Sequence, residues 1–237
     1  MYNEFILNKK ISLYVSKNNS SLSKVASLIL INNLNNISNI ILPGGKTPIG
    51  LYSELSKSKM NWEEKSILLS DERLFCKKKE NTNLFNLKKH LIDKINKKKP
   101  KLFELPHSEK SVSKCNEVFF KKKYLTILGI GTDGHIASQF RNDNDFINNS
   151  KKSYFFSEFK HNGFKRVSIS IEKILNSKEI IFLLDGEKKN NIIKKIIKNK
   201  FNEKIPYQFL IQNFKNKIRV ICNKNTIPLI YDKKYNI

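Results

Sequence analysis

Short apolar runs recur along the chain, and the segments between them carry apolar side chains every three or four residues. The apolar runs predict strands at 11–15, 38–43, 65–70, 123–129, 166–171, 179–184 and 218–223. The intervening segments predict helices at 20–35, 48–58, 82–95 and 187–199. Strands that alternate with helices of this length form βαβ units, and continuous apolar runs suit strands buried on both faces. The pattern therefore predicts an α/β fold with a largely parallel sheet.

We expect one domain over residues 1–237, because no internal repeat and no Pro-, Gly- or Ser-rich linker divides the sequence. A hydrophobic content of 39% and 16 phenylalanines are enough to form a core. The N-terminal segment includes Glu4 and lacks the apolar stretch and cleavage site of a secretion signal. No run approaches the roughly 18 apolar residues of a membrane span. We therefore expect a soluble, cytoplasmic protein.

The formal net charge of +24 at first suggests a polyanionic partner. However, 41 of the 45 basic residues are lysines, and arginine is the residue that recognises phosphates and bases by paired hydrogen bonds. Lysine, asparagine and isoleucine are enriched throughout the chain, which indicates a nucleotide bias in the coding genome. We therefore expect no specific nucleic-acid partner, and a basic nucleic-acid-binding protein stays as the less favoured alternative.

The three cysteines, Cys76, Cys115 and Cys222, are widely spaced and form no Cys-x-x-Cys pair. This spacing fits neither a disulfide framework nor a zinc site, so we expect free thiols. No two histidines have the spacing of metal ligands either. The sequence therefore predicts no metal and no cofactor.

Four polar or glycine-rich clusters follow predicted strands. They are GGKTP at 44–48, DER at 71–73, GTDGH at 131–135 and DGEKK at 185–189. In a parallel sheet, ligands bind beyond the carboxyl ends of the strands, where such clusters meet. We therefore expect one ligand site at this edge of the sheet.

The GGKTP cluster is not a nucleotide P-loop. The P-loop pattern needs a glycine five residues before Gly45, and Ile40 occupies that position. A strand, two glycines and Pro48 at the start of a helix still leave free backbone N–H groups, which bind anions. The cluster therefore predicts either an anion cradle or a simple tight turn.

The other clusters supply candidate catalytic groups. Asp71, Glu72 and Arg73 end a strand, where a plain surface turn is the alternative. In GIGTDGHIAS the glycines free the backbone to bend around a ligand, and His135 follows Asp133 by two residues. A histidine in this setting is expected to be functional and not structural. The other three histidines lie in polar or lysine-rich segments and are expected to be structural.

Together these stretches resemble the 6-phosphogluconolactonase family, within the wider group that includes glucosamine-6-phosphate deaminase. The matching stretches are LPGGKTPIGLYSEL, SDERLF with NTNLFNLKKHLI, LTILGIGTDGHIASQF, RVSISIEKILNSKEIIFLLDGEKK and, more weakly, IPYQFLIQ. They occur in the order of the family and span roughly residues 40–210.

Two differences favour the lactonase branch over the deaminase branch. Deaminases typically have tyrosine where this chain has Arg73, and Phe-Asn-Glu where it has Ser138, Gln139 and Phe140. The chain also departs from the lactonase pattern, because Pro43 and Lys46 replace small or hydroxyl residues of the phosphate loop. Thr82 replaces a common serine, and the segment 141–165 matches poorly.

The resemblance implies a Rossmann-like three-layer sandwich and hydrolysis of 6-phospho-D-glucono-1,5-lactone, a sugar-phosphate lactone, as the reaction. It implies His135 as the general base, Asp133 or Asp71 as the group that orients the base or the sugar, and Arg73 near the oxyanion or the sugar ring. The residues that it implies for the phosphate are Gly44, Gly45, Lys46, Thr47, Arg166 and Lys188. A deaminase-like reaction stays the nearest alternative, and the oligomeric state, monomer or homodimer, stays open.

Overall fold

The computed structural model describes residues 2–34, 36–96, 98–108, 117–140, 153–157 and 163–231. Its main sheet has eight strands in the order β1-β2-β11-β10-β7-β3-β4-β6. The strands are β1 (Tyr2–Ile6), β2 (Ile11–Ser16), β3 (Asn39–Leu42), β4 (Ser66–Leu69), β6 (Lys101–Phe103), β7 (Tyr124–Leu128), β10 (Glu179–Leu184) and β11 (Lys217–Asn223). Every neighbouring pair is parallel except β1 and β2, which form an antiparallel hairpin at one edge.

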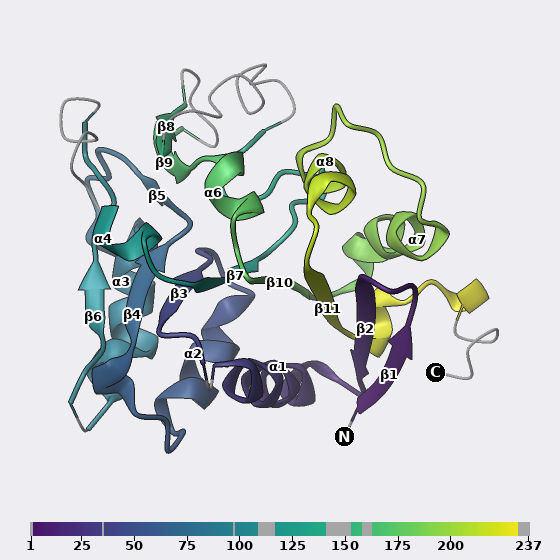
Figure 1. Cartoon of the computed structure of the whole chain (residues 1–237), viewed down its shortest axis with the longest axis horizontal. Coiled ribbons are helices and arrows are strands. Elements are labelled where there is room, and N and C mark those ends of the chain that lie inside the picture. The colour runs from purple at the N-terminus through teal and green to yellow at the C-terminus, as the bar shows by residue number, and fades with distance from the viewer. Residues whose placement is uncertain are drawn as a thin grey trace.

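Helices cover both faces of this sheet. They are α1 (Asn19–Asn33), α2 (Pro48–Ser56), α3 (Asn83–His90), α4 (Glu117–Phe120), α6 (Ile171–Leu175), α7 (Asn190–Lys198) and α8 (Pro206–Asn213). Figure 1 shows α1 and α2 on one side of the sheet and α6, α7 and α8 on the other. The predicted α/β fold with a mostly parallel sheet is therefore confirmed.

Local sequence explains where these elements lie. All residues of β3 and β10 are buried, as expected for central strands with helices on both faces. Helix α1 begins after Asn18, whose side chain accepts a hydrogen bond from the N–H of Ser21 while the Ser21 hydroxyl accepts one from the N–H of Asn18. Helix α2 has Pro48 at its first position, where the missing N–H costs no helical hydrogen bond.

A second, antiparallel sheet stands at the carboxyl end of β4. Its strands are β5 (Asp71–Arg73), β9 (Arg166–Ile169) and β8 (Tyr154–Phe156), in the order β5-β9-β8. The segment 166–171 was expected among the strands of the parallel sheet, and in the structure it pairs here instead. The chain changes sheets at Ser70, whose N–H donates to Leu42 of β3 and whose carbonyl accepts from Ile169 of β9.

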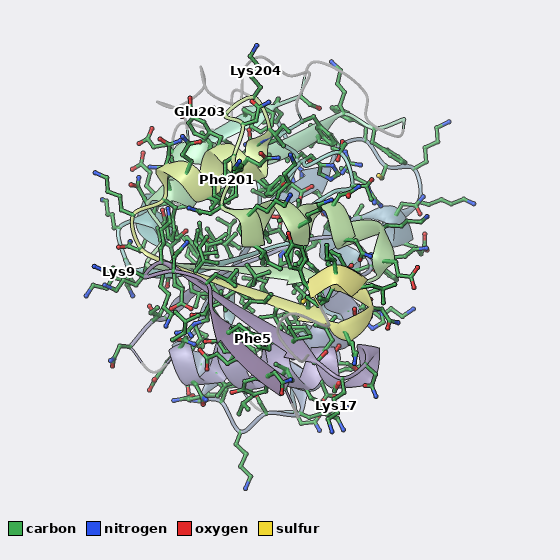
Figure 2. The ribbon with its side chains drawn as sticks, turned by 90° about the vertical axis from the view of Figure 1, so that its right-hand side faces the viewer. Phe5, Lys9, Lys17, Phe201, Glu203 and Lys204 are labelled. Carbon is green, nitrogen blue, oxygen red and sulfur yellow. The ribbon has the colours of Figure 1, made fainter. Side chains whose placement is uncertain are left out.

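Exposed lysines are spread over the surface. Figure 2 shows Lys9 in the turn between β1 and β2, Lys17 after β2, and Lys204 in the loop before α8, all on the outside of the molecule. Such side chains keep their charge in water. Within the described segments, no helix is both long enough and apolar enough to cross a membrane.

Candidate active site

A polar cavity of about 250 Å³ opens at the carboxyl ends of the parallel strands. Three of the four polar clusters line it. The lining residues are Pro43, Gly44 and Gly45 after β3; Ser70, Asp71 and Arg73 after β4; Gly129, Ile130, Gly131, His135 and Ala137 after β7; and Asn83 and Arg166. Three of the four clusters expected at this edge of the sheet therefore meet there, and no residue of the fourth, 185–189, lines the cavity.

The loop after β3 brings bare backbone to the cavity. Gly45 has φ +88°, a conformation that favours glycine, and a Cβ at Gly44 would lie 2.1 Å from the side chain of Asn83. Lys46 and Thr47 are exposed, do not line the cavity, and the Thr47 side chain makes no capping hydrogen bond to α2. The part of this loop that faces the cavity is therefore the glycine backbone.

Asp71 lies at the centre of a buried hydrogen-bond network. Its Oδ1 accepts from the Ser70 hydroxyl at 2.9 Å, and its Oδ2 accepts from the Ser138 hydroxyl at 2.7 Å. The Arg166 Nη1 lies 3.7 Å from the same Oδ2, and the Asn83 amide donates to the Asp71 carbonyl at 2.8 Å. Both carboxylate oxygens are occupied, so Asp71 is fixed in place and balances the charge of Arg166.

Glu72, the next residue, does not line the cavity, and its carboxylate caps the N-terminus of α3. Its Oε1 accepts from the N–H groups of Arg73 and Asn83, and its Oε2 accepts from the N–H of Leu84. Burial raises the pKa of Glu72, and the three N–H donors oppose that shift. The residue therefore anchors α3, and with it Asn83, against β5.

We expect Glu72→Ala to lower the free energy of unfolding by about 1–3 kcal/mol, because three backbone N–H groups lose their acceptor. Urea unfolding followed by circular dichroism measures the change. Glu80→Ala is the matched control, since Glu80 is exposed in the same connection. Equal stability of the two variants would contradict the anchoring role.

The turn after β7 presents His135. The His135 Nδ1 lies 2.6 Å from Asp133 Oδ1, and this hydrogen bond lowers the pKa of Asp133 to about 2. The N–H of Gly131 donates to the His135 carbonyl at 2.8 Å, and a Cβ at Gly131 would lie 2.1 Å from the imidazole. Gly134 has φ +91°, and its carbonyl accepts from the N–H of Tyr207 in α8. The glycines thus let the backbone wrap closely around the histidine ring.

Two guanidinium groups line the cavity. Arg166 is buried, and burial lowers its pKa while Asp71 opposes that shift. Arg73 is half-buried, donates to the Asn81 carbonyl, and lies over the ring of Phe164. Among the described residues, the Nε atoms of both arginines are buried without a hydrogen-bond partner. A cavity with two such donors suits an anionic ligand.

The lysines of the fourth cluster differ in their environment. Lys188 is exposed and does not line the cavity. Its neighbour Lys189 is half-buried, and its Nζ donates at 2.6 Å to the carbonyl of Ile130, a lining residue. Burial lowers the pKa of Lys189, and Asp133 opposes that shift. The sequence signal, two adjacent lysines after a strand, could not tell which of them faces the site.

The described residues contain no group of three or more His, Cys, Asp or Glu side chains that could hold a metal ion. The ionisable side chains that line the cavity are one imidazole, one fixed carboxylate and two guanidiniums. This set can move a proton and neutralise an anion.

Fold and site together define an α/β protein with a cation-lined ligand cavity at the carboxyl ends of its parallel strands. A family model described as glucosamine-6-phosphate isomerases/6-phosphogluconolactonase matches residues 21–220. The chain therefore belongs to this family of enzymes, and the family resemblance seen in the sequence is confirmed.

Individual relatives come from both branches of the family. The 6-phosphogluconolactonase of Helicobacter pylori (strain ATCC 700392 / 26695) is 29% identical over 192 residues, which cover 78% of this chain and 84% of that protein. The glucosamine-6-phosphate deaminase of Clostridium novyi is 29% identical over 240 residues, which cover 88% and 95%. The solved structure of a 6-phosphogluconolactonase from Shewanella baltica has a TM-score of 0.75 at 17% identity and covers 92% of this chain and 100% of its own. At that identity the likeness establishes the fold.

Proposed function

We propose that this chain hydrolyses 6-phospho-D-glucono-1,5-lactone to 6-phospho-D-gluconate. The observation that carries the proposal is that His135, which pairs with Asp133, lines the same cavity as Arg166 and the glycine backbone of residues 44 and 45. The first pair suits proton transfer and the second pair suits a phosphate. The lactonases among the relatives support the same reaction.

In the proposed mechanism His135 is the general base. Its Nδ1–H donates to Asp133, which leaves the lone pair of Nε2 free to accept a proton from water. The resulting hydroxide attacks C1 of the lactone and forms a tetrahedral oxyanion, which the guanidinium of Arg73 stabilises. The intermediate collapses as the bond between C1 and the ring oxygen breaks, and the ring oxygen takes the proton from His135. Water is consumed, and the product is the open-chain acid.

The substrate phosphate is proposed to lie against Arg166 and the N–H groups of Gly44 and Gly45. Lys46 and Thr47, which are exposed beside this loop, then contact the phosphate only from its solvent side. Asp71 orients Arg166 and, through it, the phosphate. In this arrangement the phosphate binds at the Arg166 end of the cavity, and the reaction takes place at the His135 end.

Generating the lactone in situ and following its loss with and without the protein tests the proposal, because the lactone also hydrolyses unaided. A rate above the spontaneous one, with no release of ammonia from glucosamine 6-phosphate, is expected. Ammonia release without faster lactone loss would support the deaminase reaction instead. The absence of both activities would contradict the proposed function of this cavity.

Lactone hydrolysis is expected to fall as the pH drops, because a protonated imidazole cannot accept a proton from water. Asp133, whose pKa is about 2, stays ionised throughout an assay between about pH 5 and 8 and adds no step to the profile. Asp133→Asn should lower kcat, since the imidazole loses the charged acceptor that fixes its orientation. Asp93→Asn, at an exposed carboxylate, is the control. A kcat equal to that of the parent in Asp133→Asn would contradict the pairing.

The two adjacent lysines give a matched pair of variants. Lys189→Ala is expected to raise KM about tenfold, because a half-buried cation beside the cavity is lost. Lys188→Ala should change KM less than about twofold, since an exposed charge in water is largely screened. Initial rates over a range of lactone concentrations measure both. The reverse order of effects would assign the phosphate contact to Lys188.

A further inference from the structure

An aromatic ring that does not line the cavity contacts both the candidate base and the candidate phosphate-binding cation. The Phe140 ring centroid lies 4.6 Å from that of His135, with the planes inclined by 37°. The Arg166 guanidinium carbon lies 5.9 Å from the same Phe140 centroid. A tilted ring contact and a cation–π contact both depend on an aromatic ring. Phe140 therefore connects the two functional ends of the cavity.

A second path connects the same two ends through Ser138. The Ser138 side chain is fully buried and donates to Asp71 Oδ2 at 2.7 Å. That oxygen also lies 3.7 Å from Arg166 Nη1. Ser138 and Phe140 belong to the segment that follows His135 in the chain, so the two paths form a closed series of contacts.

The backbone between these residues is held against β9, the strand that carries Arg166. Ala137 has φ +50°, which is strained for a residue with a side chain and persists only where the surroundings fix it. The Ser138 N–H lies 3.3 Å from the Ser168 hydroxyl, and the Gln139 amide donates to the Ile169 carbonyl at 2.7 Å. The turn is thus attached to β9 through both backbone and side chain.

We infer that Phe140 and Ser138 are positioning residues that set the distance between His135 and Arg166. Neither side chain lines the cavity, so they act through the residues that they contact. The inference rests on the proposed lactonase function, in which the phosphate is held at one end while water attacks C1 at the other. A misplacement of about 1 Å between such ends can cost roughly a hundredfold in rate.

Phe140→Leu keeps an apolar side chain of similar size and removes the ring. We expect kcat to fall about tenfold and KM to rise several-fold in this one variant, because both the base and the cation lose their common support. A residue that acts on the base alone would lower kcat only, and one that acts on the phosphate alone would raise KM only. Phe140→Tyr keeps the aromatic face and is expected to restore both parameters to within about threefold of the parent.

Two controls separate positioning from general loss of packing. Phe119→Leu removes a fully buried ring near the amino end of β3, where the Phe119 carbonyl accepts from Asn39. Ser177→Ala removes a buried hydroxyl that pairs with Thr126 at 2.6 Å, and it is compared with Ser138→Ala. Thermal unfolding checks that all variants are folded. Each control should lower the melting temperature and leave kcat and KM within about twofold of the parent.

The measured kcat, KM and melting temperatures decide between the outcomes. An active parent with Phe140→Leu and Ser138→Ala both impaired, and both controls unimpaired, supports the inference. An active parent in which Phe140→Leu behaves like Phe119→Leu, or in which Ser138→Ala behaves like Ser177→Ala, overturns it. A parent that does not accelerate lactone loss contradicts the proposed function itself, which keeps the two failures distinguishable.

Discussion

Replacing His135 with glutamine should lower kcat for lactone hydrolysis by roughly a hundredfold to ten-thousandfold, the range in which a general base contributes. Glutamine is similar in reach and can donate to Asp133, but its amide cannot accept a proton from water near neutral pH. Among the residues that the structure describes, His135 is the only histidine that lines the cavity. Stopped assays of lactone generated in situ, corrected for spontaneous hydrolysis, measure the loss.

Binding provides the control for this variant. His135→Gln should bind 6-phosphogluconate within about threefold of the parent in calorimetry, since the proposed phosphate contacts are untouched. His90→Gln, at a residue on α3 that does not line the cavity, should leave kcat unchanged. Turnover close to that of the parent in His135→Gln would remove this residue from the mechanism.

The second large effect is expected at Arg166. A hydrogen bond to a charged group is worth about 1.5–3 kcal/mol, so Arg166→Ala should raise KM roughly tenfold to a hundredfold. The effect on kcat should be smaller if the phosphate is held equally in the ground and transition states. Arg166→Lys keeps the charge but loses the flat guanidinium over Phe140, so its KM should lie between those of the parent and the alanine variant.

Substrates without a phosphate test the same contact independently. An unphosphorylated gluconolactone should be a poor substrate for the parent and nearly indifferent to Arg166→Ala. Inhibition should be clear with 6-phosphogluconate and weak with ATP, because the glycine loop does not have the spacing of a nucleotide loop. Tight binding of ATP, or an unchanged KM in Arg166→Ala, would contradict the sugar-phosphate cradle.

The sequence predicted six strands of the main sheet, β2, β3, β4, β7, β10 and β11, because each is an apolar run. It did not indicate the edge strands β1 and β6, whose residues are exposed or half-buried. It missed the antiparallel sheet for a physical reason. Strand β5 has only three residues, and all three are charged. Asp71 and Glu72 are buried, and hydrogen bonds satisfy their carboxylates. The segment 166–171 has the same apolar pattern as a central strand, and only its pairing with β5 and β8 places it elsewhere.

The site was predictable to the extent that each group lies in a local motif. His135 and Asp133 are two residues apart, so their contact is a property of one turn. Apart from Ser70, the partners of Asp71 are not local. Asn83 and Ser138 lie 12 and 67 positions along the chain, and nothing in either segment indicates which carboxylate it meets. Contacts of this kind depend on how whole elements pack.

The order of strands in the main sheet has a consequence for how the protein is made. Strand β11, which begins at Lys217, lies between β10 and β2, so the N-terminal hairpin can join the sheet only after the last strand has emerged. At a synthesis rate of about 5–20 residues per second, the ribosome needs roughly 10–40 s to travel from β2 to β11. During that interval the edge of β2 that later pairs with β11 has no partner on the nascent chain, and it is open to pairing with another chain.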